Sequence, residues 1–355
     1  MQPSSDRPAA LAEHGASGSS GFLTRWRLLL RWLPLVLVAG GFSWAYYAYV
    51  LVFCRLLVLH DSVVKGAAFG IGFHLLLVFC LWCYAQTTVR APPAVPSTYS
   101  LSEGEQVALA CCRSERTRRG LLDMLAAERG VLTAGADGCA RYCEACRLMK
   151  PDRCHHCSTC ARYEPQRCVP KMDHHCPWFN NCVCFSNYKF FLLTLFYVVL
   201  LSIFTVATTG VQLAEWWDSV DHINPFRFHF GFLVFTGSAL ILVLGSFLGT
   251  HLPMVLRNET TLECMRRPAF ADPHDSFDVG RYENFVQVFG PKVSLWALPL
   301  FTSLGDGVRF PTKLHPLQEA RDSEPPFVAT NYSVATYSTG SASMPPGAAV
   351  LEVVP

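Results

Sequence analysis

The sequence predicts an all-α polytopic membrane protein with four transmembrane helices and a small cysteine-rich domain between helices 2 and 3. Three observations predict this fold class. Hydrophobic residues make up 51% of the 355-residue chain and charged residues only 16%, a balance typical of membrane proteins. Four uncharged apolar runs each have the length of a bilayer crossing, and ten of the sixteen cysteines fall within residues 139–184.

The four predicted spans are residues 32–53, 66–86, 190–214 and 230–252, and basic residues stand beside them. They divide the chain into an N-terminal segment (1–31), spans 1 and 2 (32–86), a central loop (87–189) whose cysteine-rich part is 139–189, spans 3 and 4 (190–252), a C-terminal region (253–310) and a tail (311–355). The tail is rich in Pro, Ser, Thr and Gly with few apolar residues, so we expect it to be disordered.

The positions of the basic residues predict the orientation of the spans. Arg25, Arg27 and Arg31 precede span 1, Arg90 follows span 2 and Arg257 follows span 4. The loop between spans 3 and 4 instead carries the acidic residues Glu215, Asp218 and Asp221. Because basic loops stay in the cytosol, we expect both termini and the central loop to be cytosolic. The net charge of only +2 gives no reason to expect a nucleic-acid partner.

The first part of the central loop predicts a helix. Ser102 and Glu105 have the spacing of a capping box, and the helix is expected to run to about Arg129.

The cysteines that follow predict metal binding, because clustered cysteines in a reducing cytosol bind metal more readily than they form disulfides. Two Cys-x2-Cys pairs, Cys143 with Cys146 and Cys157 with Cys160, each offer two thiolates to a tetrahedral zinc. Two structural zinc ions need four more ligands. The candidates are Cys168, Cys182 and two histidines from the set His155, His156, His174 and His175. With these ligands, zinc would stabilise the cytosolic domain. Cys176 is not needed as a ligand and is free for another role.

The segment KMDHHCPWFNNC, residues 171–182, predicts a role for that remaining cysteine. In an extended strand alternate side chains share a face, so His174 and Cys176 point together and His175 points the opposite way. If His175 faces a zinc ion, Cys176 lies beside His174 on the other face. Asp173 is near enough to orient the imidazole, which gives the acid–base–nucleophile order that activates a thiol. Cys176 is therefore the predicted nucleophile.

These segments also resemble a known family. The block from RYCEACRLMKPDRCHHCSTC to KMDHHCPWFNNCVCFSNYKFF is similar to the zinc-finger Asp-His-His-Cys (DHHC) protein S-acyltransferases, the palmitoyltransferases. Their architecture is also four spans with the finger between the second and third. Thr260, Thr261, Leu262 and Glu263 match the family's TTxE motif, and residues 284–307 resemble its C-terminal aromatic motif, with Asn284 as the matching asparagine. The flanks SWAYYAYV, FSNYKFF and FTSLGDG resemble the subgroup of the plasma membrane and Golgi.

The resemblance implies a ligand set and a reaction. It groups the zinc ligands as Cys143, Cys146, His156 and Cys168 in one site and Cys157, Cys160, His175 and Cys182 in the other. Asp173, His174 and Cys176 would be catalytic. A long-chain acyl-CoA, such as palmitoyl-CoA, would acylate Cys176, and a cysteine of a membrane-associated substrate protein would then take the acyl chain. Thr261 would support the catalytic segment from the end of span 4.

The resemblance also implies binding residues for the donor. Ala45 in span 1 and Leu201 in span 3 would face each other at the closed end of a cavity for the acyl chain. The basic residues Lys150, Arg153, His155 and Arg266 are candidates for binding the phosphates of CoA.

The sequence departs from the family pattern near the zinc ligands. ARYEPQR separates Cys160 from Cys168, which is five residues more than usual, so Cys154 competes with Cys168 as a ligand. Cys184 stands where the family has a glycine, and it would be strained if that position needs a positive φ. These departures keep a second function class open, a zinc-organised membrane scaffold with impaired catalysis.

Overall fold

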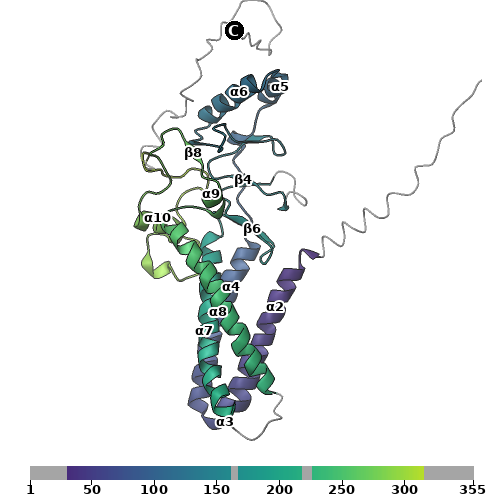
Figure 1. The fold of residues 1–355 in the computed structure, drawn as a ribbon, viewed down its shortest axis with the longest axis vertical. Helices are drawn as coiled ribbons and strands as arrows, with labels where there is room; N and C mark the ends of the chain where they lie inside the picture. The colour runs from purple at the N-terminus through teal and green to yellow at the C-terminus, as the bar shows by residue number, and fades with distance from the viewer. Residues whose placement is uncertain (1–29, 161–166, 218–225, 316–355) are drawn as a thin grey trace, which may run out of the picture.

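The computed structural model describes residues 30–160, 167–217 and 226–315. In Figure 1 these residues form a stem of long helices with a domain of short strands, loops and small helices at one end. The tail was predicted to be disordered from residue 311, but Thr312 is buried and its hydroxyl donates to Asp275, so the start of that prediction is wrong. The tail beyond residue 315, the N-terminal segment up to residue 29 and the inserted residues 161–166 lie outside the described residues.

Four helices in the described part of the chain are long and apolar enough to cross a membrane: Leu33–Asp61, Val63–Val89, Tyr188–Val211 and Phe228–Leu256. They correspond to α2 (Leu33–Tyr46) with its continuation η1 (Tyr47–Val58) and α3 (Leu59–Asp61), α4 (Val63–Val89), α7 (Tyr188–Trp217) and α8 (Phe226–Leu256). The fold class predicted from the sequence, four spans with a cysteine-rich domain between the second and third, is confirmed.

The first span is longer than predicted. The helix continues past Arg55, through a π-helical stretch, to Asp61. The chain then turns at Ser62, whose extended backbone and side-chain acceptor for the Lys65 N–H start α4. A helix ends where other partners take over its terminal backbone groups, as happens at Ser62. A single charged side chain such as that of Arg55 leaves the backbone bonds in place and does not end the helix.

Aromatic packing and the close approach of two helices hold the stem together. Tyr49 of η1 stacks on Phe73 of α4 with ring centroids 4.5 Å apart, and its hydroxyl bonds to Thr208 of α7. Gly237 allows α8 to approach α7 closely, since a Cβ there would lie 2.6 Å from the Val206 side chain. In contrast, α2 buries no residue fully, and Figure 1 shows its N-terminal end leaning away from the other helices.

The central loop begins with two helices where one was predicted. The capping box of Ser102 and Glu105 is confirmed and starts α5 (Glu103–Cys111). The backbone is extended at Cys112, and Ser114 starts the second helix, α6 (Glu115–Glu128), by accepting the Thr117 N–H. The prediction of one continuous helix is wrong because Ser114 acts as an N-cap.

The rest of the domain is built from two-stranded antiparallel pairs of two or three residues each. The pairs are β2 (Tyr142–Cys143) with β3 (Leu148–Met149), β4 (His155–His156) with β5 (Cys168–Val169), β6 (His174–Cys176) with β7 (Asn181–Val183), and β1 (Thr133–Ala134) with β8 (Ala269–Phe270). Strands this short do not hold their shape alone, so the domain depends on other ties.

The segment after α8 returns to the cysteine-rich domain. It contains α9 (Thr261–Met265), strand β8, α10 (Arg281–Phe289) and η4 (Val293–Leu295). Asn284 of α10 is fully buried, and its amide donates to the carbonyl of Leu256 (2.9 Å) and to Asp278 Oδ1 (2.6 Å). Leu256 is the last residue of α8, so Asn284 satisfies a carbonyl that the helix itself leaves without a donor.

We expect Asn284→Ala to lower the free energy of unfolding by about 1–3 kcal/mol, because it leaves buried acceptors unpaired. Thermal unfolding of the detergent-solubilised protein measures this. Tyr282→Ala, on the exposed side of the same helix, is the matched control and should change little. An equal effect of both substitutions would contradict the role assigned to the Asn284 amide.

Candidate active site and zinc centres

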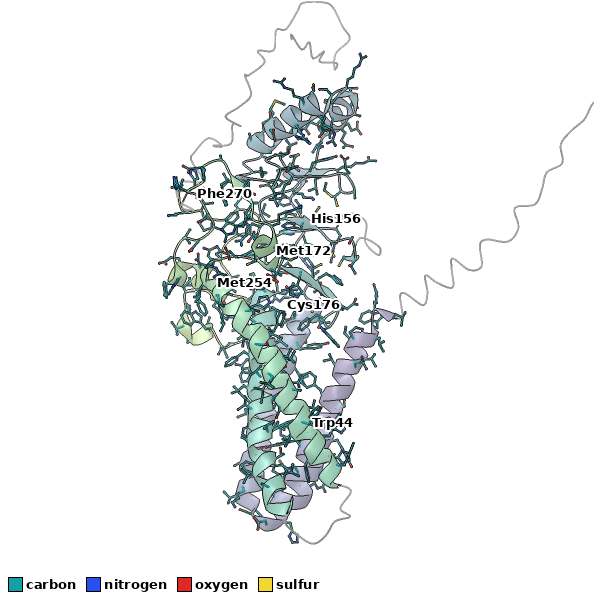
Figure 2. The ribbon with its side chains drawn as sticks, viewed as in Figure 1. Trp44, His156, Met172, Cys176, Met254 and Phe270 are labelled. Carbon is teal, nitrogen blue, oxygen red and sulfur yellow. The ribbon has the colours of Figure 1, made fainter. Side chains whose placement is uncertain are left out.

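The β6–β7 hairpin has one face for metal and one for the candidate nucleophile. Its register pairs His175 with Cys182 directly across the two strands, while Cys176 pairs with Asn181. Because side chains alternate along a strand, His174 and Cys176 lie on the face opposite His175. In Figure 2, Cys176 lies where the domain meets the helical stem.

Eight side chains form two groups that suit metal ions. The groups are Cys143, Cys146, His156 and Cys168, and Cys157, Cys160, His175 and Cys182, with the donor atoms of each group within 4.8 Å of one another. Three thiolates and one imidazole are a common donor set for structural zinc, so the residues fit the predicted cofactor. The grouping is the interleaved one that the family resemblance implies.

Each group has its histidine among its sulfurs. His156 Nδ1 lies 3.5 and 3.3 Å from the Sγ atoms of Cys143 and Cys146. His175 Nδ1 lies 3.6 and 3.4 Å from those of Cys157 and Cys160. All sixteen cysteines lie in the described part of the chain and none forms a disulfide, so the clustered thiols are free to bind metal.

The two departures from the family pattern leave this geometry intact. Cys168 belongs to the first group, with its Sγ 4.0 Å from His156 Nδ1, whereas Cys154 is buried nearby but lies outside the group. Cys184 is not among the residues with positive φ, so a side chain there causes no strain. Its thiol is fully buried, and its N–H donates to Asn187. The structure therefore gives no support to the impaired-scaffold alternative.

The carboxylate of Asp173 is fixed from two sides. Its Oδ2 accepts from His174 Nδ1 at 2.6 Å and from the Thr261 hydroxyl at 2.9 Å, while Oδ1 accepts from the Thr261 N–H at 2.9 Å. Burial alone would raise the pKa of Asp173, but the bonds from His174 and Thr261 hold it below its ordinary value. Thr261 thus contacts Asp173 from the segment that follows α8, the contact that the TTxE resemblance implies.

His174 is held as a strong base. Burial alone would lower the pKa of His174, but hydrogen bonds with Asp173 and Cys176 raise it to about 9. With Nδ1 committed to Asp173, Nε2 is the nitrogen left for the thiol. Cys176 itself is 8% exposed and belongs to the apolar cluster that includes Phe191 and Val183.

Two asparagines that the sequence reasoning did not single out attach the hairpin to span 2. Asn181 Nδ2 donates to the carbonyls of Thr87 (3.0 Å) and Arg90 (2.7 Å) at the end of α4. Asn187 Nδ2 donates to the Thr87 carbonyl of α4 (3.3 Å) and, within the hairpin, to the Cys182 carbonyl (2.9 Å). Asn181 lies within the segment KMDHHCPWFNNC and Asn187 stands just before the third apolar span, and these positions were the signal in the sequence.

Arg153, predicted to bind CoA phosphates, is instead an interior residue, and that prediction is wrong. It is 2% exposed, and its guanidinium donates to Glu263 Oε1 (2.7 Å) and Oε2 (2.6 Å) and to Asn258. It is also stacked over Phe277. A guanidinium enclosed by these partners has no surface to offer an anion. Its effect is to join the cysteine-rich domain to the segment after α8.

The other predicted phosphate ligands differ in character. Burial, followed by the charge of Arg141, lowers the pKa of His155 to about 4, so its imidazole is neutral near pH 7. Lys150 is half-buried and Arg266 is exposed, so these two keep accessible charges.

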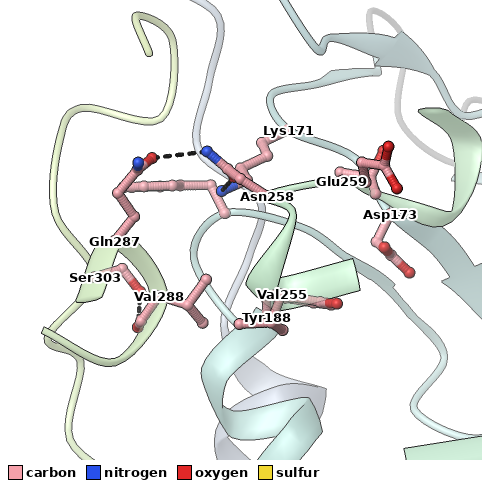
Figure 3. Close-up of a pocket in the computed structure, with 11 residues that line it drawn as sticks. Lys171, Asp173, Tyr188, Val255, Asn258, Glu259, Gln287, Val288 and Ser303 are labelled. Carbon is pink, nitrogen blue, oxygen red and sulfur yellow. Dashed lines mark hydrogen bonds between the residues drawn. The ribbon is translucent and has the colours of Figure 1, made fainter. Parts of the chain in front are cut away.

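A small cavity with polar and apolar lining residues lies between the segment before the hairpin, α8 and α10. It has a volume of about 20 Å³, room for a single water molecule, and Lys171, Asp173, Tyr188, Asn258 and Gln287 are among its lining residues (Figure 3). Burial, with the charge of Arg153, lowers the pKa of Lys171 to about 7. Its ammonium donates to Asn258 Oδ1 at 3.2 Å. The segment that precedes the hairpin therefore lies against the C-terminal region at this cavity.

Ala45 and Leu201, predicted to close the acyl cavity, belong to one apolar cluster in the stem together with Tyr49 and Phe73. The structure therefore brings residues of spans 1 and 3 together there. His251 of α8 was not predicted. It is 1% exposed and lies near His174, and the signal for it was an ionisable residue near the end of an apolar span.

Known proteins match this chain both in its cysteine-rich domain and over most of its length. Residues 137–268 match the family model described as DHHC palmitoyltransferase. The chain is 37% identical over 312 residues to palmitoyltransferase ZDHHC2 of Danio rerio, covering 87% of this chain and 84% of that protein. It is 36% identical over 324 residues to palmitoyltransferase ZDHHC20 of Homo sapiens (90% and 86% covered) and 35% identical over 343 residues to palmitoyltransferase ZDHHC15 of Homo sapiens (94% and 96% covered).

The two cysteines at the end of the hairpin provide a matched test of the metal sites. We expect Cys182→Ala to lose about one zinc per chain and to destabilise the domain, because structural zinc contributes folding free energy directly. Cys184→Ala, two residues away and outside both groups, should keep the full zinc content. Elemental analysis of the purified protein measures both. Equal zinc content in the two variants would show that the second group is not a zinc site.

Proposed function

The chain belongs to the DHHC palmitoyltransferase family, and from this we propose that it is a protein-cysteine S-palmitoyltransferase that works through a thioester on Cys176. The observation that carries the proposal is the position of Cys176. It shares a hairpin face with His174, away from the metal face, and His174 is bonded to an Asp173 that Thr261 holds in place. The donor is a long-chain acyl-CoA and the acceptors are cysteines of membrane-associated proteins.

In the first step the acyl group moves from CoA to the enzyme. The proton of the Cys176 thiol passes to His174 Nε2, whose pKa of about 9 favours the imidazolium, and the Sγ atom then attacks the carbonyl carbon of acyl-CoA. The bond from the carbonyl carbon to the CoA sulfur breaks, and that sulfur takes the proton from His174. Asp173 stays ionised and stabilises the imidazolium, as its bonds to His174 and Thr261 favour.

In the second step the acyl group moves to the substrate protein. His174 takes the proton of the incoming cysteine, whose sulfur attacks the Cys176 thioester. The bond to Cys176 Sγ breaks, and this sulfur recovers a proton from His174. The two half-reactions use the same residues, so the kinetic scheme is ping-pong.

The two zinc ions, when bound, supply structural stability to the domain, and the protein residues perform the chemistry. The Cys157, Cys160, His175 and Cys182 group would fix the register of the hairpin, which is too short to fix it alone. A shift of one residue would move Cys176 to the metal face.

The same proposal covers the location of the enzyme. Four spans make the chain a multi-pass membrane protein, and we place the active site and both termini on the cytosolic side from the distribution of basic residues. Lys150 and Arg266 remain the proposed ligands of the CoA phosphates. The subgroup resemblance supports the Golgi and the plasma membrane as its compartments.

A hydroxylamine-release assay tests the mechanism. Purified wild-type protein should take up labelled acyl chain from palmitoyl-CoA in a form that hydroxylamine releases. Cys176→Ser should abolish both uptake and transfer while keeping its zinc, and His174→Ala should lower both rates by about 10²–10⁴-fold, the usual contribution of a general base. Cys184→Ala is the control for loss of an unrelated thiol. Robust transfer by Cys176→Ser would rule the mechanism out.

Chain-length preference tests the proposed acyl cavity. Ala45 is small and Leu201 is smaller than an aromatic side chain, so an 18-carbon chain should be accepted at least as well as a 16-carbon chain. Each additional buried methylene contributes about 0.8 kcal/mol. Ala45→Phe should shift the preference to shorter chains in a competition between 14-, 16- and 18-carbon acyl-CoAs. A wild-type preference for 14 carbons, or no shift in Ala45→Phe, would contradict this assignment.

A further inference from the structure

His251 is a buried polar residue of α8 that the proposed mechanism does not use. It is 1% exposed and is surrounded by aromatic rings, with Phe247 at 4.7 Å and Phe191 at 5.1 Å between centroids. Its Nδ1 shares a hydrogen bond of 3.1 Å with the hydroxyl of Tyr188, the first residue of α7. The bond therefore joins the start of span 3 to the end of span 4.

The same rings enclose the proposed base. The His174 ring contacts Phe191 edge-on at 5.3 Å and the His251 ring at 6.3 Å. Phe191 in turn stacks on Tyr188 at 6.1 Å. The torsion that turns an imidazole about its Cβ–Cγ bond has broad minima, so one bond at Nδ1 does not fix the ring by itself. These packed rings limit the remaining rotation of His174.

The Tyr188–His251 bond also fixes the two helices that support the catalytic segment. Tyr188 follows the hairpin directly, and its N–H donates to the Cys184 carbonyl. On the other side, α8 leads into Thr261, which donates two hydrogen bonds to Asp173. A sliding of α8 against α7 would therefore move Thr261 relative to the hairpin. Tyr188 and Asp173 line the same small cavity, so little space separates the two contacts (Figure 3).

Packing alone does not require an imidazole at this position. A phenylalanine ring would fill the space and stack as well, without the cost of burying ring nitrogens among aromatic groups. A buried imidazole is tolerated because a partner satisfies it, and Tyr188 is that partner. The hydrogen bond supplies a directional constraint that ring packing lacks.

We propose that His251, through its hydrogen bond with Tyr188, is a positioning residue that keeps His174 aligned with Cys176. This inference rests on the proposed function, in which His174 takes the Cys176 proton. His251 does not touch the reacting atoms in this account. It acts through the placement of His174 and of the Thr261–Asp173 pair, and an error of about 1 Å in such placement lowers rates by as much as 10²-fold.

The test compares variants of the full-length, zinc-loaded protein. His251→Phe keeps the ring and removes the hydrogen bond, Tyr188→Phe removes one hydroxyl, and His251→Asn keeps a polar atom near the position of Nδ1. Thr250→Val is the control, because this neighbouring residue is exposed and bonds only to its own helix, at the Phe247 carbonyl. Each variant is assayed for zinc content, thermal stability, acylation of Cys176 by palmitoyl-CoA, and alkylation of the Cys176 peptide by iodoacetamide, followed by mass spectrometry.

We expect His251→Phe and Tyr188→Phe to lower both the acylation and the alkylation rates by about tenfold or more, with zinc content unchanged. His251→Asn should recover most of the loss, and Thr250→Val should match the wild type. The double variant His174→Ala/His251→Phe should be no slower than His174→Ala alone, because residues acting through one group are not additive.

Three results would overturn the inference. The first is that His251→Phe reacts at wild-type rates. The second is slow acylation with normal alkylation, which would mean that His251 acts in binding the acyl donor. The third is a double variant that is slower than His174→Ala alone. If His251→Phe fails to fold, Tyr188→Phe decides by the same criteria. The proposed function fails separately, since it requires the wild-type protein itself to form a hydroxylamine-sensitive thioester at Cys176.

Discussion

The attachment of the β6–β7 hairpin to the end of span 2 is the interaction on which the rest of the site depends. The last carbonyls of a helix have no donors within it, and a buried carbonyl without a donor is costly. In α4 these donors come from Asn181, which bonds to the carbonyls of Thr87 and Arg90. Because Asn181 is paired with Cys176 across the hairpin, the bonds that complete the helix also fix the position of Cys176, the proposed nucleophile, at the end of the stem.

A second tie fixes the hairpin from the side of span 4. Glu263 accepts two bonds from the buried Arg153 and also closes the capping box with Thr260. A bidentate arginine–carboxylate pair has a defined geometry, and breaking one inside a protein typically costs about 3–5 kcal/mol. The pair thus holds the start of α9 in the orientation that lets Thr261 reach Asp173. The stem, the zinc domain and the C-terminal region meet at this point.

The parts of the protein that local rules specify could be predicted from the sequence. Span positions follow from uncharged runs of sufficient length, and the capping box at Ser102 follows from residue spacing. The opposite faces of His174 and His175 follow from strand periodicity, and the hairpin register agrees with them. The break between α5 and α6 was also local, and the N-cap Ser114 was its visible signal.

What the sequence could not show depends on contacts between distant segments. A basic residue such as Arg153 is usually exposed, and its burial becomes understandable only beside Glu263, 110 positions later. The neutral state of His155 likewise depends on how the folded domain surrounds it. Asn181 and His251 find their hydrogen-bond partners on α4 and α7. These contacts join residues far apart in the sequence, so local sequence patterns do not reveal them.

The separation between Asp173 and Thr261 has a consequence for how an active molecule is made. A ribosome completes the eight metal-binding side chains by Cys182, before it has made the third span, and chains begin to fold from the N-terminus during synthesis. The hydroxyl that fixes the acid arrives 88 residues after the acid itself, beyond the fourth span. A nascent chain halted inside the fourth span would therefore hold its metal ligands and its thiol but lack an oriented acid. On the proposed function, the acid that orients His174 is therefore fixed only after the fourth span has been made.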